Sequence, residues 1–401
     1  MKMKREYWFF ILLSGTGWIF SACRKPYSPP AISGNNNYLV VEGIVAAGPD
    51  STIINLNRTI KISGTNTANP ESGATVIVEG DQGVKYTLTE GKKGRYTAPS
   101  LNLDNSHKYH LLISTADGRT YASDYEPVKI TPPIDSLYYT INKDNAGLTV
   151  FTNTHDPANS TRYYRWEYME TYVYNTDLTS YFIFDPDQYS DTLKSVLRKP
   201  DQMIDTCYIT RHSTSVLLNS TAALTQDIIQ RNPIEGIPDT SERLKIRYSV
   251  LVKQYALTRD AYNFWYNIRR NTQQIGTIFD VQPSEIPGNI HCTSNPSEPV
   301  IGYISVSSIA RKRIFIDRAE LPGWIFPLPQ CNSYSVCWLR GSPVASDLSA
   351  GNVIPMGPIM PASCNLDGVA KPGYAVRVAY YFCADCRYHL NGVTTKPSFW
   401  K

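Results

Sequence analysis

The sequence lacks the short motifs that commonly mark an enzyme. It contains no Gly-x-Ser-x-Gly elbow, no His-Glu-x-x-His, no phosphate-binding P-loop and no Gly-x-Gly-x-x-Gly. Charged residues make up only 18% of the chain, and no Lys/Arg block of the kind that binds nucleic acid is present. Lys2, Lys4, Arg5 and Glu6 supply half of the net charge of +4. We therefore predict no catalytic residue from motifs and no nucleic-acid partner.

Histidines and acidic residues are too scattered to predict a metal or a cofactor. Asp185, Asp187 and Asp191 offer the oxygen ligands that calcium prefers, but the stretch lacks the loop glycine and bidentate Glu of an EF-hand. Cys383-x-x-Cys386 with His389 has zinc-like spacing, yet it is the only Cys-x-x-Cys in the chain. We predict neither a metal site nor a cofactor.

No apolar run reaches the ~18–20 residues that a membrane-spanning helix needs. Residues 1–22 instead have the layout of a signal peptide, with an early positive charge and an apolar stretch from Tyr7 to Phe20. The sequence that follows, Phe20-Ser21-Ala22-Cys23, resembles a bacterial lipobox. Lipid on Cys23 would attach the protein to a membrane. An ordinary cleaved signal and an uncleaved anchor are the alternatives.

Residues 23–37 are predicted to be a flexible tether after the lipidated cysteine. Pro29-Pro30 and the run Gly34-Asn35-Asn36-Asn37 cannot bury a core. Arg24 and Lys25 stand where exported surface lipoproteins usually carry acidic residues. The sequence therefore leaves open whether the protein faces the periplasm or the cell surface.

Frequent tyrosine (28), proline (27) and glycine (24) indicate β-strands separated by turns. Residues 38–131 contain short runs of strand type, including a hairpin around Gly80-Asp81-Gln82-Gly83. Their spacing predicts an immunoglobulin-like or carboxypeptidase-regulatory-like sandwich. Pro132-Pro133 marks a boundary, and residues 134–401 are predicted to form a larger β-rich domain.

Helical periodicity is strong in one place only. Ala261, Phe264, Trp265 and Ile268 share one face of a helix predicted near residues 258–275. A shorter helix is predicted between Ser220 and Gln230. The loop from Gln282 to Pro299 is stiffened by prolines, and its length makes it a candidate binding loop.

Seven cysteines follow Cys23, so an oxidising compartment would leave at least one thiol unpaired. The connectivity does not follow from the sequence. Two pairs are close enough along the chain to be plausible locally, Cys383 with Cys386 and Cys331 with Cys337.

Long stretches of the chain resemble a family of Bacteroidota lipoproteins described as domain of unknown function 4249. Residues 248–316 and 383–400 carry most of the resemblance, and YLVVEGIV (38–45) and ITPPIDSLYY (130–139) fit as well. The resemblance implies a place at the outer membrane and an accessory role beside a TonB-dependent β-barrel receptor. It implies no catalytic residue.

Three functions are compatible with the sequence. The first is a non-enzymatic accessory or binding lipoprotein, anchored to the outer membrane, of a TonB-dependent uptake or envelope complex that handles an unknown small ligand. The second is a surface adhesin or structural lipoprotein, and an exposed aromatic patch would favour it. The third is a glycan or peptide hydrolase, which would need two carboxylates ~5–10 Å apart in a cleft.

Overall fold

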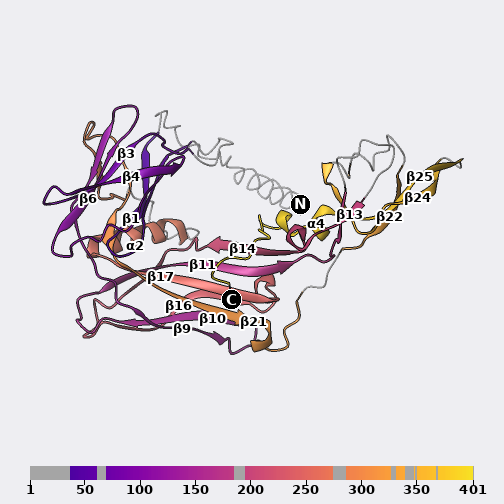
Figure 1. Cartoon of the computed structure of the whole chain (residues 1–401). Helices are drawn as coiled ribbons and strands as arrows, with labels where there is room; N and C mark the ends of the chain where they lie inside the picture. Colours follow the sequence, from indigo (N-terminus) through magenta and orange to yellow (C-terminus); the bar gives the residue numbers. More distant parts are fainter. Residues whose placement is uncertain are drawn as a thin grey trace, which may run out of the picture.

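Strands dominate the protein, as its composition predicts (Figure 1). The computed structural model describes residues 37–60, 69–184, 195–273, 286–326, 331–338, 347, 350–366 and 369–400. The helices include α2 (Arg259–Gln273) and the short α4 (Tyr381–Ala384). The predicted fold class is confirmed: a β-sandwich is followed by a larger β-rich part that contains helices.

Several sequence predictions lie outside the described residues. These are the signal peptide 1–22, Cys23, the tether as far as residue 36, and the aspartates at 185, 187 and 191. Among the described residues, no helix combines the length and apolarity needed to cross a bilayer.

The first sandwich is built from one eleven-stranded sheet that folds over itself. Strand β4 pairs with β3 on one side and with β5 on the other, so it carries the sheet from one layer to the next. Buried and less buried residues alternate along β2 and β6, as expected for strands with one face on a core. The strands from the first part of the chain are β1 (Leu39–Ala46), β2 (Thr52–Arg58), β3 (Thr75–Gly80), β4 (Lys85–Lys92), β5 (Arg95–Ala98), β6 (Lys108–Ser114), β7 (Thr120–Ser123) and β8 (Glu126–Pro127).

A segment much later in the chain completes this sandwich. Strands β18 (Ile290–Cys292), β19 (Ile301–Gly302) and β20 (Ser305–Ser307) join it, and the last two run parallel to β1. Close approach requires glycine here: at Gly302, with φ +144°, an added Cβ would lie 2.2 Å from the carbonyl oxygen of Val41. The N-terminal sandwich is therefore not one continuous stretch of sequence.

The second sandwich packs a three-stranded sheet on a five-stranded sheet. Its core contains the large side chains Tyr164, Trp166, Tyr172 and Tyr248, all fully buried. Their polar atoms have partners, as buried aromatic residues require: the Trp166 Nε1–H donates to Gln254 at 2.9 Å. The strands are β9 (Ile134–Ile141), β10 (Gly147–His155) and β16 (Ile228–Pro238) in one sheet, and β11 (Tyr163–Asn175), β14 (Thr206–His212), β15 (Leu217–Ser220), β17 (Arg247–Ala256) and β21 (Ile309–Asp317) in the other.

The helix predicted between Ser220 and Gln230 is wrong. Strand β15 ends at Ser220, a turn follows, and β16 begins at Ile228. The hydroxyl of Thr221 donates to buried Asp227, and the Thr221 amide donates to the carbonyl of Arg162 at 3.0 Å. Such contacts satisfy the polar groups outside a helix, and they override a weak helical pattern.

The longer predicted helix is confirmed as α2. Its N-terminus is capped by Thr258, whose hydroxyl accepts the Ala261 amide at 3.2 Å. Ala261 and Phe264 are buried on the predicted face, and the guanidinium carbon of Arg165 lies 3.8 Å from the ring centroid of Trp265. The last predicted residue of the helix, Ile275, lies outside the described residues.

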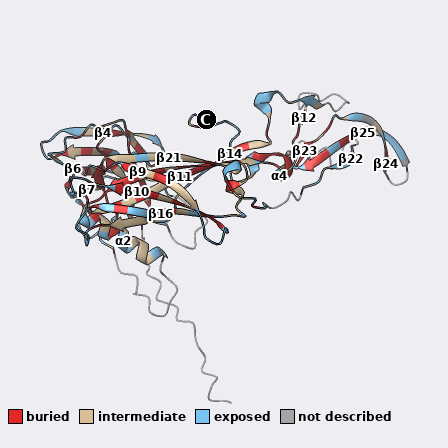
Figure 2. Ribbon diagram, turned by 90° about the horizontal axis from the view of Figure 1, so that it is seen from below, coloured by how far each residue is buried: buried red, intermediate tan, exposed pale blue. Residues whose placement is uncertain are grey.

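The C-terminal part extends away from the two sandwiches (Figure 1). Its four-stranded sheet is centred on β25, and small separate cores support it. Buried residues run through both sandwiches, whereas exposed ones are frequent in this projecting part (Figure 2). The elements here are β12 (Phe182–Phe184), β13 (Ser195–Leu197), η1 (Pro200–Gln202), β22 (Tyr334–Trp338), β23 (Val353–Pro355), β24 (Met360–Leu366), β25 (Val369–Tyr380) and η4 (Cys386–Tyr388).

Asp156, in the turn between β10 and β11, is expected to make the stability of the fold depend on pH. Burial raises the pKa of Asp156, but hydrogen bonds from the Ser160 hydroxyl and from the amides of Thr161, Ala158 and Ser160 outweigh burial and lower it to about 2. A lowered pKa stabilises the fold above the ordinary value of 3.8, and this stabilisation is lost as pH falls towards 2.

We therefore expect Asp156→Asn to lower the free energy of unfolding by about 1 kcal/mol at pH 7, after allowance for solvent screening. The difference from the unmodified protein should shrink between pH 5 and pH 2 in urea titrations. Asp144→Asn, in a neighbouring turn where the carboxylate accepts one amide bond from Ala146, is the matched control. A difference that stays constant over this pH range would contradict the assignment.

Candidate functional site

Three disulfides organise the projecting C-terminal part. They join Cys207 to Cys386, Cys331 to Cys383, and Cys337 to Cys364, while Cys292 is a buried free thiol. All four cysteines singled out from the sequence are therefore in disulfides. The local pairs Cys383–Cys386 and Cys331–Cys337 are wrong, because each of these residues bonds to a more distant partner.

Tertiary contacts explain the pairing. The amide of Cys386 donates to the carbonyl of Ile204 at 2.8 Å, which places this cysteine beside β14 and Cys207. Cys383 lies on the buried side of α4, in a small core that also contains Cys331. With their sulfurs in disulfides, Cys383 and Cys386 are not available for zinc, and no group of three candidate metal ligands occurs in the described part of the chain.

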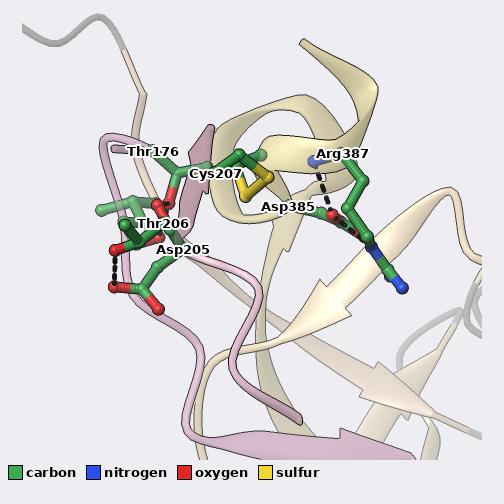
Figure 3. The surroundings of a disulfide bond; sticks show 8 residues. Thr176, Asp205, Thr206, Cys207, Asp385 and Arg387 are labelled. Atoms are coloured by element: carbon green, nitrogen blue, oxygen red, sulfur yellow. Dashed lines mark hydrogen bonds and ion pairs between the residues drawn. A yellow bond between two sulfur atoms is a disulfide. The ribbon is translucent and has the colours of Figure 1, made fainter. Parts of the chain in front are cut away.

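An ion pair fixes the segment between the two helical turns (Figure 3). The Asp385 side chain is almost fully buried and accepts the Arg387 amide at 3.0 Å and its Nε at 2.8 Å. This carboxylate raises the pKa of Arg387, which stays charged. Residues 383–387 are therefore tied by disulfides, backbone bonds and a salt bridge.

Exposed aromatic side chains gather on this fixed support. Tyr334, Tyr380, Phe382 and Tyr388 are 38%, 50%, 55% and 57% exposed, and we call them the aromatic surface. The Tyr380 and Phe382 rings stack with centroids 5.6 Å apart, and Tyr334 lies 5.6 Å from Tyr380. Tyr381 connects the set, since its ring contacts both Phe382 and Tyr388.

The chemistry of the aromatic surface suits binding. Burial and a hydrogen bond with Tyr380 raise the pKa of Tyr334, so this phenol stays neutral at physiological pH. Large rings with hydroxyl tips combine apolar contact area with hydrogen-bonding capacity, which is typical of protein interfaces. Because disulfides hold the support in place, little conformational entropy remains to be lost on binding.

The loop singled out from the sequence has a structural role in its described part, residues 286–299. Glu298 lies 3.5 Å from the Arg58 guanidinium and 3.2 Å from that of Arg119, and it accepts the Tyr121 hydroxyl at 2.8 Å. These contacts attach the loop to the first sandwich. The aromatic surface is not among the sites predicted from the sequence, although the run Tyr380-Tyr381-Phe382 directly before Cys383 is a local signal for it.

A cluster of carboxylates lies at the second sandwich, where the hydrolase alternative would look for an acid–base pair. The Arg243 Nη1 donates to Glu170 at 2.8 Å and to Glu235 at 2.9 Å, and the Tyr248 hydroxyl donates to Glu170 at 2.9 Å. Glu170 is buried, and the arrangement is an ion-pair network within the protein. Its carboxylates are occupied by protein groups.

Similarity to a known family covers most of the chain. A sequence model of the family described as Domain of unknown function (DUF4249) matches residues 24–313, and the aromatic surface lies beyond that match. No curated protein matches. Among solved structures, the crystal structure of a mutant of Salmonella alpha-2-macroglobulin is 9% identical, over 86% of this chain and 18% of that chain, with a TM-score of 0.18. A TM-score this low does not establish a shared fold.

The disulfide connectivity can be checked by mass spectrometry of a non-reduced digest. A protease that cleaves before Asp385 separates Cys383 from Cys386, so the expected products link Cys331 to Cys383 and Cys207 to Cys386. The reduced digest is the control. A product linking Cys383 to Cys386 would contradict the structure.

Stability measurements should rank the disulfides by the length of chain that each closes. Cys207→Ala with Cys386→Ala opens a link across 179 residues, and Cys337→Ala with Cys364→Ala opens one across 27. We expect the first double variant to lose roughly 1–2 kcal/mol more free energy of unfolding than the second, because loop entropy grows with length. The reverse order would show that loop entropy does not govern these links.

Proposed function

This chain belongs to the family described as Domain of unknown function (DUF4249), and on that premise we propose that it is a lipid-anchored, non-enzymatic binding protein of the outer membrane. In this proposal Cys23 carries the lipid, and the protein serves as the accessory component of a TonB-dependent uptake or envelope complex. The support for anchoring is the sequence Phe20-Ser21-Ala22-Cys23 after an apolar stretch.

The main support for a binding role is the aromatic surface. It exposes four large rings on a disulfide-supported projection, where a partner can reach them without rearrangement of either sandwich. Soluble proteins rarely leave contiguous rings exposed unless something covers them. We propose that the occupant is a protein, the β-barrel receptor, because neutral rings with hydroxyl tips match the composition of protein interfaces.

Two other functions remain as outcomes of the tests. A surface adhesin would use the same rings on a partner outside the cell, and it would leave the membrane extract without a bound receptor. A hydrolase would need a pair of carboxylates free to act on a substrate, whereas Glu170 and Glu235 are both bound by Arg243.

If Cys23 carries the lipid anchor, fatty-acid labelling of the protein should depend on this residue. Cells fed an alkyne fatty acid should label the unmodified protein, and Cys23→Ala should abolish the label because the acceptor thiol is gone. Cys292→Ala is the matched control, since it removes the thiol that stays free among the described residues. Equal labelling of Cys23→Ala and the control would contradict lipidation at Cys23.

If a β-barrel receptor docks on the aromatic surface, removal of its rings should weaken the complex. Affinity purification of the full chain from membranes at native expression should recover a β-barrel protein. Tyr380→Ala with Phe382→Ala should lower that recovery at least ~10-fold, because buried rings often contribute 2 kcal/mol or more to binding.

Tyr266→Ala is the control for this experiment, because Tyr266 is 39% exposed on α2, which lies far from α4 (Figure 1). Its recovery of the receptor should match that of the unmodified protein. Purification of the lipoprotein alone, or an equal loss in both variants, would contradict the proposed docking.

A further inference from the structure

A cavity of about 380 Å³, open to solvent, is lined by Thr206 and Tyr208, the two neighbours of the disulfide-bonded Cys207. Its walls come from η1, from the beginning of β14 and from the C-terminal residues 394–396. The side chains that matter chemically are those of Asp201, Asp205, Thr206, Tyr208 and Lys396. Figure 3 shows Asp205 and Thr206 on one side of Cys207, with Asp385 and Arg387 on the other.

The C-terminal wall is a strap that is attached at both ends. Before the cavity, Val393 and Tyr208 exchange backbone hydrogen bonds of 2.8 and 3.1 Å. After it, the buried Trp400 ring packs edge-on against Tyr208, with centroids 5.2 Å apart, and against Phe315 at 5.5 Å. Residues 394–396 therefore span the cavity between two fixed points.

The opposite wall is equally fixed. The disulfide holds Cys207, and the amide of Thr176 donates to the carbonyl of Asp205 at 2.8 Å. The contacts that hold the backbone at Asp205 therefore do not involve its carboxylate. Within the wall, that carboxylate accepts a hydrogen bond from the Thr206 hydroxyl at 3.4 Å. The backbone of both walls is therefore held in place, and the volume of this solvent-open cavity falls in the range of small-molecule sites, roughly 300–1,000 Å³.

We propose that this cavity binds a neutral, polyhydroxylated small molecule of the size of a monosaccharide. The carboxylates of Asp201 and Asp205 can accept hydrogen bonds from ligand hydroxyls, while the Lys396 ammonium and the Thr206 hydroxyl can donate to them. The Tyr208 ring offers an apolar face to the C–H groups of a sugar.

The same groups disfavour other ligand classes. Two carboxylates repel an anion, and Lys396 offsets part of their attraction for a cationic amine. A divalent cation would find two carboxylates, fewer than the oxygen set that calcium requires, and the part of the chain that the structure describes holds no group of three candidate ligands.

The test is ligand-observed NMR titration of the detergent-solubilised full chain with D-glucose, D-galactose and D-mannose. At least one should bind with a Kd of ~1 mM or tighter. Asp201→Asn with Asp205→Asn should weaken that binding at least ~10-fold, because each amide offers one acceptor oxygen in place of two and lacks the charge that strengthens these hydrogen bonds. Both changes keep side-chain size, and circular dichroism checks the fold.

Two controls separate the outcomes. Asp144→Asn, a turn variant on the second sandwich, should bind as the unmodified protein does, and Tyr380→Ala with Phe382→Ala should as well, since the cavity does not depend on receptor docking. Absence of binding by all three sugars, binding that survives loss of both aspartates, or binding of Ca²⁺ in place of sugar would each overturn the proposal. None of these results tests the proposed docking of the β-barrel receptor, so the two proposals can fail independently.

Discussion

The disulfide between Cys207 and Cys386 is the constraint on which the proposed binding features of this protein depend. It joins β14 of the second sandwich to the C-terminal turn across 179 residues of sequence. Space around it is tight: an added Cβ at Gly392 would lie 2.8 Å from the Cβ of Cys207. Tyr388 of the aromatic surface lies in the same turn as Cys386, and Thr206 and Tyr208, the neighbours of Cys207, line the cavity. Both features would lose support if the C-terminal turn separated from β14.

A second constraint holds the sandwiches together. Glu126 in β8 is buried, and its carboxylate accepts hydrogen bonds from Tyr303 at 2.6 Å, from Asn289 at 3.3 Å and from Thr258 at 3.3 Å. These partners come from three segments: the start of α2, the loop before β18 and the stretch between β19 and β20. Burial raises the pKa of Glu126, and the three donors offset part of that cost. Helix, loop and first sandwich thus meet at one polar group.

The elements predicted correctly from the sequence are those whose residue pattern is local. The short strand-type runs predicted within residues 38–131 are present as strands, including the hairpin around Gly80-Asp81-Gln82-Gly83, which joins β3 to β4. Thr258 and the apolar face of residues 261–268 likewise predict α2. The prediction for residues 220–230 failed because Asp227 accepts hydrogen bonds from Thr221 and Tyr164, and nothing in the local pattern reveals these contacts.

The sequence by itself determined the strand-rich character, α2 and the cysteine inventory, since each rests on the chemistry of neighbouring residues. Only the tertiary structure decided which cysteines pair and that residues 290–307 complete the first sandwich. It also decided that Tyr380 and Phe382 face solvent beside each other, and that Asp205 and Lys396 line one cavity. These features depend on which distant segments become neighbours. That choice is made by the packing of whole sheets, which no short stretch of sequence encodes.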